Sequence, residues 1–256
     1  MNDRLFVHVP YSFLQQNLEL VLAKRVNPEV FFSGDMLDTL IPEELAAIAA
    51  TLAGNGLETT IHAPFMDLNP GSVERLIRDV TLHRLHQVLD AAAILKPRVI
   101  VFHPGYDRWR YGESQDKWLQ HSIATWREVL PRAAEIGCTV AIENIFEEEP
   151  STLVALFEAL PELRHCFDVG HWNLFTNVGM EEWFDAVGSF IAEAHIHDNH
   201  GLRDDHAPVG EGNIDFSVFF RLMARYAPQA AWTIEAHSKE DLDRSLANIG
   251  KFLQAT

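Results

Sequence analysis

Basic residues and long apolar runs are both scarce in this chain of 256 residues. Lysine and arginine number 20 against 37 aspartates and glutamates, which gives a formal net charge of −17. Phosphate recognition draws its affinity from basic side chains, so we do not expect nucleic acid to be the main partner. No stretch reaches the roughly 18 consecutive apolar residues of a membrane-spanning helix, so we expect no membrane association.

Cysteine is almost absent, and Cys138 and Cys166 each lie in an apolar, strand-like segment. Two separate buried thiols fit a reducing compartment better than a disulfide does. The first ten residues, MNDRLFVHVP, are charged and pass at once into a strand-like run, unlike a signal peptide. These features favour a cytoplasmic protein. Nothing in the sequence favours one oligomeric state over another.

Several catalytic motifs are missing as well. There is no G-x-S-x-G elbow, no phosphate-binding P-loop and no C-x-x-C pair. The sequence therefore does not indicate a serine hydrolase, a P-loop nucleotidase or a dithiol enzyme. A glycosidase-like pair of carboxylates, Glu143 and Glu235, stays open, but it leaves every histidine unexplained.

Short β-branched runs alternate with helical patterns along the chain. Helical segments such as 72–95 space their apolar residues three and four apart, and Pro131 predicts a kink or break in the segment 114–137. Eight strands are predicted at residues 5–9, 29–32, 58–63, 98–103, 139–144, 165–169, 192–197 and 231–236. This alternation predicts an α/β fold, a (β/α)8 TIM barrel forming a single domain over residues 1–256, with an open doubly wound sheet as the alternative.

Histidines and carboxylates recur where the predicted strands end. In a TIM barrel these ends surround one mouth, where active sites form, so residues far apart in sequence are expected to meet there. One isolated histidine would be an ordinary rim residue, but recurrence on six consecutive strands indicates a shared cause, a metal site. The residues are His62, His103, Glu143, Asp168 with His171 shortly after it, His195 and Glu235.

The segment HIHDNHGLRDDHAPVGEG, at 195–212, is unusually rich in histidine and acid. His195 and His197 are two positions apart, so both point to the same face of the barrel, and only one of them need be a ligand. Asp204 and His206 follow in a loop whose glycines allow a tight return over the mouth. His8, at the end of the first strand, is expected at the rim.

Seven short motifs give the chain a resemblance that covers most of its length. They are IHAPF, VFHPG, AIEN, FDVGH, HIHD, DDHAPVGEG and TIEA, in that order. In order and spacing they resemble the xylose isomerase-like TIM barrel superfamily, and within it the AP endonuclease family 2 branch that contains endonuclease IV.

The resemblance implies particular metal ligands. The endonuclease IV branch holds three zinc ions with nine residues, and its seventh-strand pattern His-x-x-Asp selects His195 rather than His197. Carried over, the nine are His62, His103, Glu143, Asp168, His171, His195, Asp204, His206 and Glu235. The sugar isomerase and epimerase branch holds one divalent ion with the equivalents of Glu143, Asp168, His195 and Glu235, and there the two glutamates also move protons.

Three metal-dependent functions account for these residues. The surplus ligands favour phosphoester hydrolysis of a small substrate by water activated at several zinc ions, with Glu143 bridging two of them. The alternative is a sugar or sugar-phosphate isomerase or epimerase in which Glu143 and Glu235 transfer protons. The third is a metal-binding protein without turnover.

The metal and the substrate contacts are less sharply defined by the sequence. The histidine-rich ligand set suits zinc, and Mn, Fe, Co or Mg are further candidates. The segment HPGYDRWRYG indicates a modest pocket for a small anion or ring. The residues expected to contact the substrate are His197, Tyr106, Arg108, Trp109 and Arg110.

Overall fold

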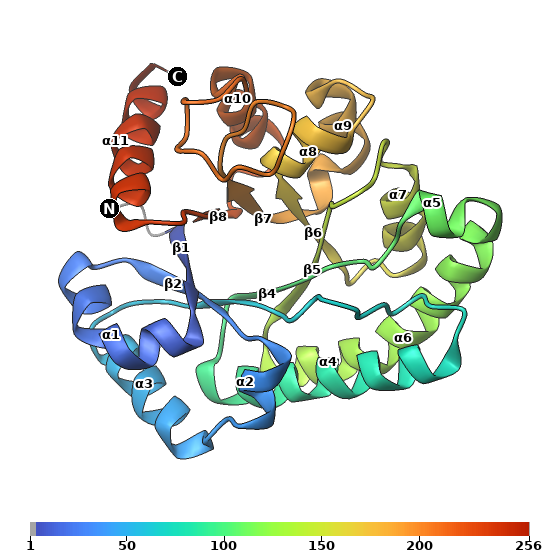
Figure 1. Cartoon of the computed structure of the whole chain (residues 1–256), viewed down its shortest axis with the longest axis horizontal. Helices are drawn as coiled ribbons and strands as arrows, with labels where there is room; N and C mark the ends of the chain where they lie inside the picture. The colour runs from blue at the N-terminus through green and yellow to red at the C-terminus, as the bar shows by residue number, and fades with distance from the viewer. Residues whose placement is uncertain (1–3, 256) are drawn as a thin grey trace.

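The computed structural model describes residues 4–255, and in it eight parallel strands close into a barrel in chain order. Figure 1 shows the strands at the centre of the molecule with helices around them. All eight predicted strands and the (β/α)8 architecture are thereby confirmed. The strands are β1 Leu5–Pro10, β2 Asn27–Phe31, β3 Thr60–His62, β4 Val99–Phe102, β5 Thr139–Glu143, β6 Arg164–Asp168, β7 Ile191–Ile196 and β8 Ala231–Ile234.

The helices of the described residues follow the strands in sequence and pack against the outside of the barrel. Short helices and 3-10 turns occur in several of the segments that follow strands. The helices are α1 Tyr11–Lys24, α2 Gly34–Asp38, α3 Pro42–Gly54, α4 Arg75–Leu95, α5 Arg108–Tyr111, α6 Gln115–Ile136, α7 Ser151–Ala159, α8 Val169–Phe175, α9 Met180–Val187, α10 Phe216–Tyr226 and α11 Lys239–Ala255, with 3-10 turns η1 Gly112–Ser114 and η2 Gly188–Phe190.

Alternation along each strand separates the two faces of the barrel wall. On β4, Ile100 and Phe102 belong to the large apolar core between barrel and helices, whereas Val99 and Val101 belong to a separate small cluster with Ala141. Side chains two positions apart share a face, so Glu143, two residues beyond Ala141, continues the inner face of β5 toward the mouth. The strands therefore carry apolar residues lower in the barrel and polar ones at its C-terminal end.

Helix α6 lacks the break that was one of the two outcomes expected from Pro131. It runs unbroken from Gln115 to Ile136 with Pro131 inside it. Proline removes the hydrogen bond to the carbonyl four residues earlier, that of Arg127. Both Pro131 and Arg127 are exposed, so water can satisfy the freed carbonyl and the helix need not break there.

Two other sequence-based expectations can be compared with the fold. Cys138 and Cys166 are free and buried, as the sequence predicted. Among the described helices, none combines the length and the apolar character needed to span a membrane.

The segment between β7 and α10 is organised by the buried carboxylate of Asp198. The backbones of Asp198 and Ala207 exchange two hydrogen bonds of 2.8 Å. The Asp198 side chain also accepts hydrogen bonds from the N–H groups of Gly210, Gly212 and Ile214 at 2.8–3.2 Å. Figure 1 shows this segment looping beside α11 and α8. The loop that carries Asp204 and His206 is thus fixed at its base.

Candidate metal centre

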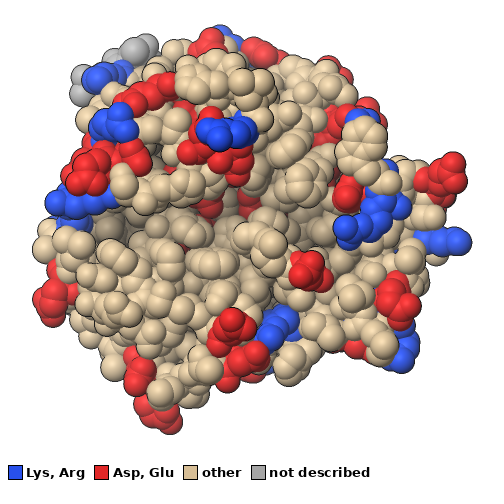
Figure 2. Space-filling view, viewed as in Figure 1, with Lys and Arg blue, Asp and Glu red and all other residues tan. Residues whose placement is uncertain are grey.

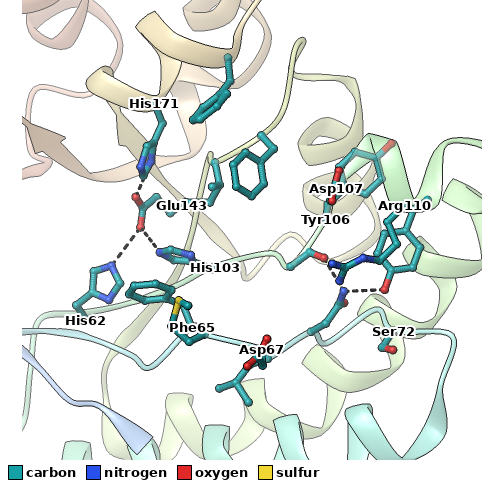
Figure 3. Close-up of a pocket in the computed structure, with 18 of the residues that line it drawn as sticks. His62, Phe65, Asp67, Ser72, His103, Tyr106, Asp107, Arg110, Glu143 and His171 are labelled. Atoms are coloured by element: carbon teal, nitrogen blue, oxygen red, sulfur yellow. Dashed lines mark hydrogen bonds and ion pairs between the residues drawn. The ribbon is translucent and has the colours of Figure 1, made fainter. Parts of the chain in front are cut away.

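Glu143, at the C-terminal end of β5, lies at the centre of a histidine cluster. Its Oε2 is 3.3 Å from Nε2 of His62 and 3.3 Å from Nε2 of His103. The two histidines end β3 and follow β4, so three successive strands deliver these groups to one point. Figure 3 shows the two imidazoles converging on one oxygen of the carboxylate while His171 approaches the other.

The hydrogen bonds around His62 indicate that this cluster suits a cation. His62 Nδ1 lies 2.9 Å from the carbonyl oxygen of its neighbour Ala63, which can only accept, so Nδ1 carries a proton. In the neutral ring, Nε2 then presents a lone pair to a carboxylate oxygen that has no hydrogen-bond partner of its own. Two acceptors face each other, and either a proton or a metal ion between them relieves the repulsion.

The other oxygen of Glu143 faces a second group of donors. Glu143 Oε1 is 3.1 Å from Nδ1 of His171 and 3.5 Å from Nδ1 of His195. His195 Nδ1 also lies 3.8 Å from Asp168 Oδ2 and 3.4 Å from Glu235 Oε1. It is buried and has no hydrogen-bond partner among the described residues. Three carboxylates therefore surround one unpartnered imidazole nitrogen.

A third group forms where the loop after β7 folds back. Asp204 Oδ2 lies 3.4 Å from Nε2 of His171 and 3.0 Å from Nε2 of His206. His206 Nδ1 in turn lies 3.6 Å from Glu235 Oε2. His206 adopts a positive φ of 45°. The structure thus joins all nine residues predicted as ligands into one connected network.

His197 lies in this network rather than in contact with the cavity. Its ring is buried, stacks on that of His206 at 4.0 Å, and places Nε2 3.2 Å from Asp168 Oδ2. Its Nδ1 has no hydrogen-bond partner, and His197, His206 and Glu235 together offer three donor atoms within 4.8 Å of one another. This geometry gives His197 the environment of a further candidate ligand, although the sequence had indicated a contact with the substrate.

Local sequence explains how Asp168 and its neighbours are held. Asp168 ends β6 and caps α8, because its Oδ1 accepts a 2.6 Å hydrogen bond from the N–H of His171. Asn144 joins β5 to β6 by two 2.9 Å hydrogen bonds to the backbone of Asp168. Gly170 leaves room for His197, since a Cβ there would lie 2.0 Å from its ring. The motifs AIEN and FDVGH therefore contain residues that hold the candidate metal ligands in place as well as the candidate ligands themselves.

The acids and imidazoles shift one another's pKa values. Burial acts to raise the pKa of Glu143, but the charges of His195 and His103 outweigh it and hold the pKa well below its ordinary range. Burial lowers the pKa of His62, yet the hydrogen bond and charge of Glu143 raise it to about 9. Without metal, a proton is therefore held where a cation would lie, and metal binding has to displace it.

A cavity of about 1050 Å³ opens over these groups. Its lining includes His62, His103, Glu143, Asp204 and Glu235 at one end and Tyr106, Tyr111 and Arg110 at the other, with Phe31, Phe65, Phe146 and Phe175 between them. Figure 2 shows the hollow as mostly uncharged, with acidic side chains at its floor. This size accommodates a small organic molecule.

Only some of the residues predicted to contact the substrate line this cavity. Tyr106 and Arg110 line this cavity. Arg108 forms an ion pair with Glu148, stacks on Trp109 at 4.1 Å and lines a smaller neighbouring pocket instead. Trp109 is 83% exposed and is not among the residues that line the cavity. The structure therefore brings only part of the HPGYDRWRYG segment to the candidate site.

Sequence reasoning missed two buried glutamates in the barrel interior. Glu29 on β2 and Glu193 on β7 are both fully buried. Glu193 accepts hydrogen bonds from Thr60 and Thr233, and burial raises its pKa to about 8. Alternation supplied a signal for Glu193, because it precedes His195 by two residues and shares its face. Glu29 had only the weaker signal of a charge inside an apolar run.

The fold and the site define a parallel barrel with histidine and carboxylate donors at its C-terminal mouth, an arrangement typical of barrel enzymes. The chain belongs to the xylose isomerase-like TIM barrel family, whose pattern matches residues 28–254. The resemblance drawn from the short motifs is thereby confirmed at the level of the family.

Curated relatives are similar over much of the chain. The protein MJ1614 of Methanocaldococcus jannaschii is 32% identical over 206 residues, covering 77% of this chain and 78% of the relative. A probable endonuclease 4 of Mycobacterium leprae is 25% identical over 213 residues, covering 77% of this chain and 81% of the relative. An L-ribulose 3-epimerase of a Methylomonas species is 26% identical over 136 residues, covering 50% and 46%.

Solved structures share the fold over nearly the whole length. The TTHB071 protein of Thermus thermophilus, soaked with ZnCl2, superposes with a TM-score of 0.82 at 24% identity over 99% of both chains. A D-tagatose 3-epimerase-like protein gives the same TM-score and identity over 98% of this chain and 97% of its own.

Proposed function

We propose that this protein is a divalent-metal-dependent isomerase or epimerase acting on a small, sugar-like substrate. The observation that carries the proposal is the convergence of Glu143, Asp168 and Glu235 on the unpartnered Nδ1 of His195, at 3.4–3.8 Å. This is the four-residue set expected for one ion in the sugar branch of the family. The similarity to an L-ribulose 3-epimerase supports it. Hydrolysis, which the surplus of ligands had favoured from the sequence, becomes the second candidate.

The four residues suit a divalent ion because they combine one imidazole nitrogen with carboxylate oxygens, in a buried position where unpaired charge is costly. A bound ion would supply positive charge that polarises a substrate carbonyl and its neighbouring hydroxyl. Burial acts to raise the pKa of Glu143, but the nearby imidazoles hold it well below its ordinary range, so Glu143 is ionised at neutral pH.

Two carboxylates can move a proton between two positions of such a substrate. Glu143 and Glu235 both line the cavity. One accepts the proton from the carbon next to the carbonyl, and the electron pair of that C–H bond shifts toward the carbonyl oxygen. Return of a proton to the opposite face of the same carbon gives the epimer. Its return to the former carbonyl carbon, together with transfer of the neighbouring hydroxyl proton to the former carbonyl oxygen, gives the isomer.

Proton exchange with solvent tests this proposal. The protein, loaded in turn with Mn²⁺, Co²⁺, Mg²⁺ and Zn²⁺, is incubated in D2O with a panel of ketoses, ketose phosphates and aldoses, and NMR follows deuterium at the carbon next to the carbonyl. We expect exchange and interconversion of at least one sugar pair. Glu143→Gln and Glu235→Gln should abolish it, while Glu147→Gln, which changes a buried glutamate outside the cavity lining, should retain it. Phosphoester cleavage without any exchange would contradict the proposal.

Phosphoester hydrolysis is retained as a second candidate because Asp204, His206 and His171 lie together beyond what one ion requires. The similarity to a probable endonuclease 4 supports this candidate. In a hydrolase these residues would hold a further ion close to the reacting phosphate, so Asp204→Ala should lower kcat by about a hundredfold to a thousandfold. In a one-ion isomerase the same change should mainly raise KM.

A further inference from the structure

Glu29 lies in the barrel interior between two histidines. Its Oε1 is 2.9 Å from Nδ1 of His8, and its Oε2 is 3.0 Å from Nε2 of His195. The carboxylate is fully buried, so neither oxygen is hydrated by bulk solvent. A buried carboxylate of this kind requires the protons that the two imidazoles supply.

The arrangement assigns opposite tasks to the two nitrogens of His195. An ionised carboxylate can only accept hydrogen bonds, so Nε2 carries a proton and donates it to Glu29. The neutral ring then has its lone pair on Nδ1, the nitrogen that faces Glu143, Asp168 and Glu235. Because both oxygens of Glu29 already have imidazole partners, the residue is better placed to orient a ligand than to act as one.

We propose that Glu29 is a positioning residue that fixes the ring orientation and tautomer of His195 and so presents Nδ1 to a divalent ion. This inference rests on the metal site of the proposed function but concerns a residue outside its four-ligand set. Glu29 also restrains His8, which lines the cavity and places Nδ1 3.5 Å from Glu235. One buried acid thus couples a candidate ligand on β7 to a cavity-facing histidine on β1.

Glu29→Gln tests the role with little change in shape. The amide keeps one oxygen that accepts a hydrogen bond from one histidine, but it presents an N–H group to the other. The nitrogen that faces this N–H group can accept its hydrogen bond only if it carries no proton. The variant cannot satisfy His8 and His195 in their present tautomers at once. Loss of the negative charge also makes His195 less basic as a ligand, and changes to such supporting residues reduce metal affinity by about 10- to 100-fold.

Glu193→Gln is the matched control. Glu193 is another fully buried glutamate of the barrel interior, and its hydrogen bonds run to the hydroxyls of Thr60 and Thr233. Both variants therefore replace one buried glutamate of the same region by its amide, although only Glu29 is ionised at neutral pH. Only Glu29→Gln removes the hydrogen-bond partner of a candidate ligand.

The first measurement is Co²⁺ affinity, from chelator competition followed by the visible absorption of the bound ion. We expect Glu29→Gln to weaken the site by about 10- to 100-fold and to change the absorption spectrum. Glu193→Gln should stay within about twofold of wild type. Equal losses in both variants, or no loss in Glu29→Gln, would overturn the proposal, because a merely structural role predicts changes in stability alone.

The second measurement does not depend on metal. Histidine-selective ¹⁵N NMR of the metal-free protein, with His195 assigned by its substitution, shows whether Nε2 carries a hydrogen-bonded proton. We expect that proton in wild type and in Glu193→Gln, with a changed resonance in Glu29→Gln. If wild type binds no metal, the proposed function fails while this result still tests Glu29. If Glu29→Gln does not fold, an unprotonated Nε2 in wild type would still refute the positioning role.

Discussion

At the scale of single residues, burial decides what each ionisable group of the site can do. Glu143 is kept ionised by several imidazoles, whereas at Glu147, four residues later, the charge of His171 does not outweigh burial. Glu147 Oε2 accepts a 2.7 Å hydrogen bond from the N–H of Ile145, but its Oε1 is buried without a hydrogen-bond partner. Burial raises the pKa of Glu147 to about 7, from an ordinary 4.5. Two neighbouring acids of similar burial therefore differ in charge under mildly acidic conditions.

This difference predicts a pH-dependent contribution of Glu147 to stability. Between pH 4.5 and 7 the folded state holds a proton on Glu147 that the unfolded chain has released. The contribution of this group to the free energy of unfolding is therefore fully present below pH 4.5 and is lost as the pH rises through 7. The shift corresponds to about 3 kcal/mol. Glu147→Gln cannot titrate, so urea unfolding should show the variant gaining up to about that amount over wild type between pH 4.5 and 8. A difference that does not change with pH would contradict the shift.

Some residues of the candidate site could be predicted from the sequence, and others could not. The nine candidate ligands could be proposed from the sequence because they lie at or just beyond the ends of apolar strands or in the acidic loop after β7, and because the family resemblance implied the full set. Glu29 and Arg108 could not be placed this way. A carboxylate inside a strand has the same sequence signature whether it faces solvent or a histidine 166 positions away. Arg108 was expected near the substrate, and nothing local indicated that Glu148, 40 positions later, would pair with it.

At the scale of elements, the loop after β7 is the part of the site that depends most on one side chain. Asp198 is fully buried and receives the hydrogen bonds of three backbone N–H groups from 210–214. Gly212 packs directly against it, since a Cβ there would lie 2.2 Å from Asp198 Oδ1. The sequence predicted a tight return from its glycines, and the positive φ of Gly210, 79°, confirms that one of them is needed.

We therefore expect Asp198→Ala to cost about 3 kcal/mol or more, because several buried donors lose a charged acceptor. In this variant Asp204 and His206 should no longer be held in position, so the affinity of the site for any ion that they bind should fall. Asp205→Ala is the control in the same loop. Its side chain forms an ion pair with Arg203, an 82% exposed side chain, so the change should alter stability by less than about 0.5 kcal/mol. Similar urea midpoints for the two variants would contradict the role of Asp198.

The strands and helices were more predictable than this loop. Alternating short β-branched runs and 3.6-residue patterns gave all eight strands, because the barrel buries each element in the way its periodicity requires. Pro131 was expected to kink or break its helix. The break does not occur, because the cost of a proline depends on whether the freed carbonyl faces water, which is a tertiary property. The loop after β7 has no periodicity, so only its composition, and not the role of Asp198, could be predicted.

At the scale of the whole molecule, the charge distribution argues against a polyanion as partner. The net charge is −17, Figure 2 shows basic side chains scattered around the hollow, and the cavity lining includes one arginine, Arg110. At physiological salt we expect no tight complex with duplex DNA that contains an abasic site, because few phosphates could be neutralised. Fluorescence anisotropy with labelled duplex checks this. Efficient cleavage of such DNA at nanomolar protein would show that local features outweigh the overall charge.

The central claim is that the barrel mouth holds a divalent metal through the groups around Glu143 and His195. Elemental analysis of protein purified without added metal, followed by titration of Zn²⁺, Mn²⁺ and Co²⁺ into chelator-treated protein, tests it most directly. The account predicts at least one tightly bound equivalent per chain, lost in Glu143→Gln and retained in Glu147→Gln. More than one tight equivalent would favour the hydrolase over the one-ion isomerase. A folded protein that binds none of these ions would contradict the account.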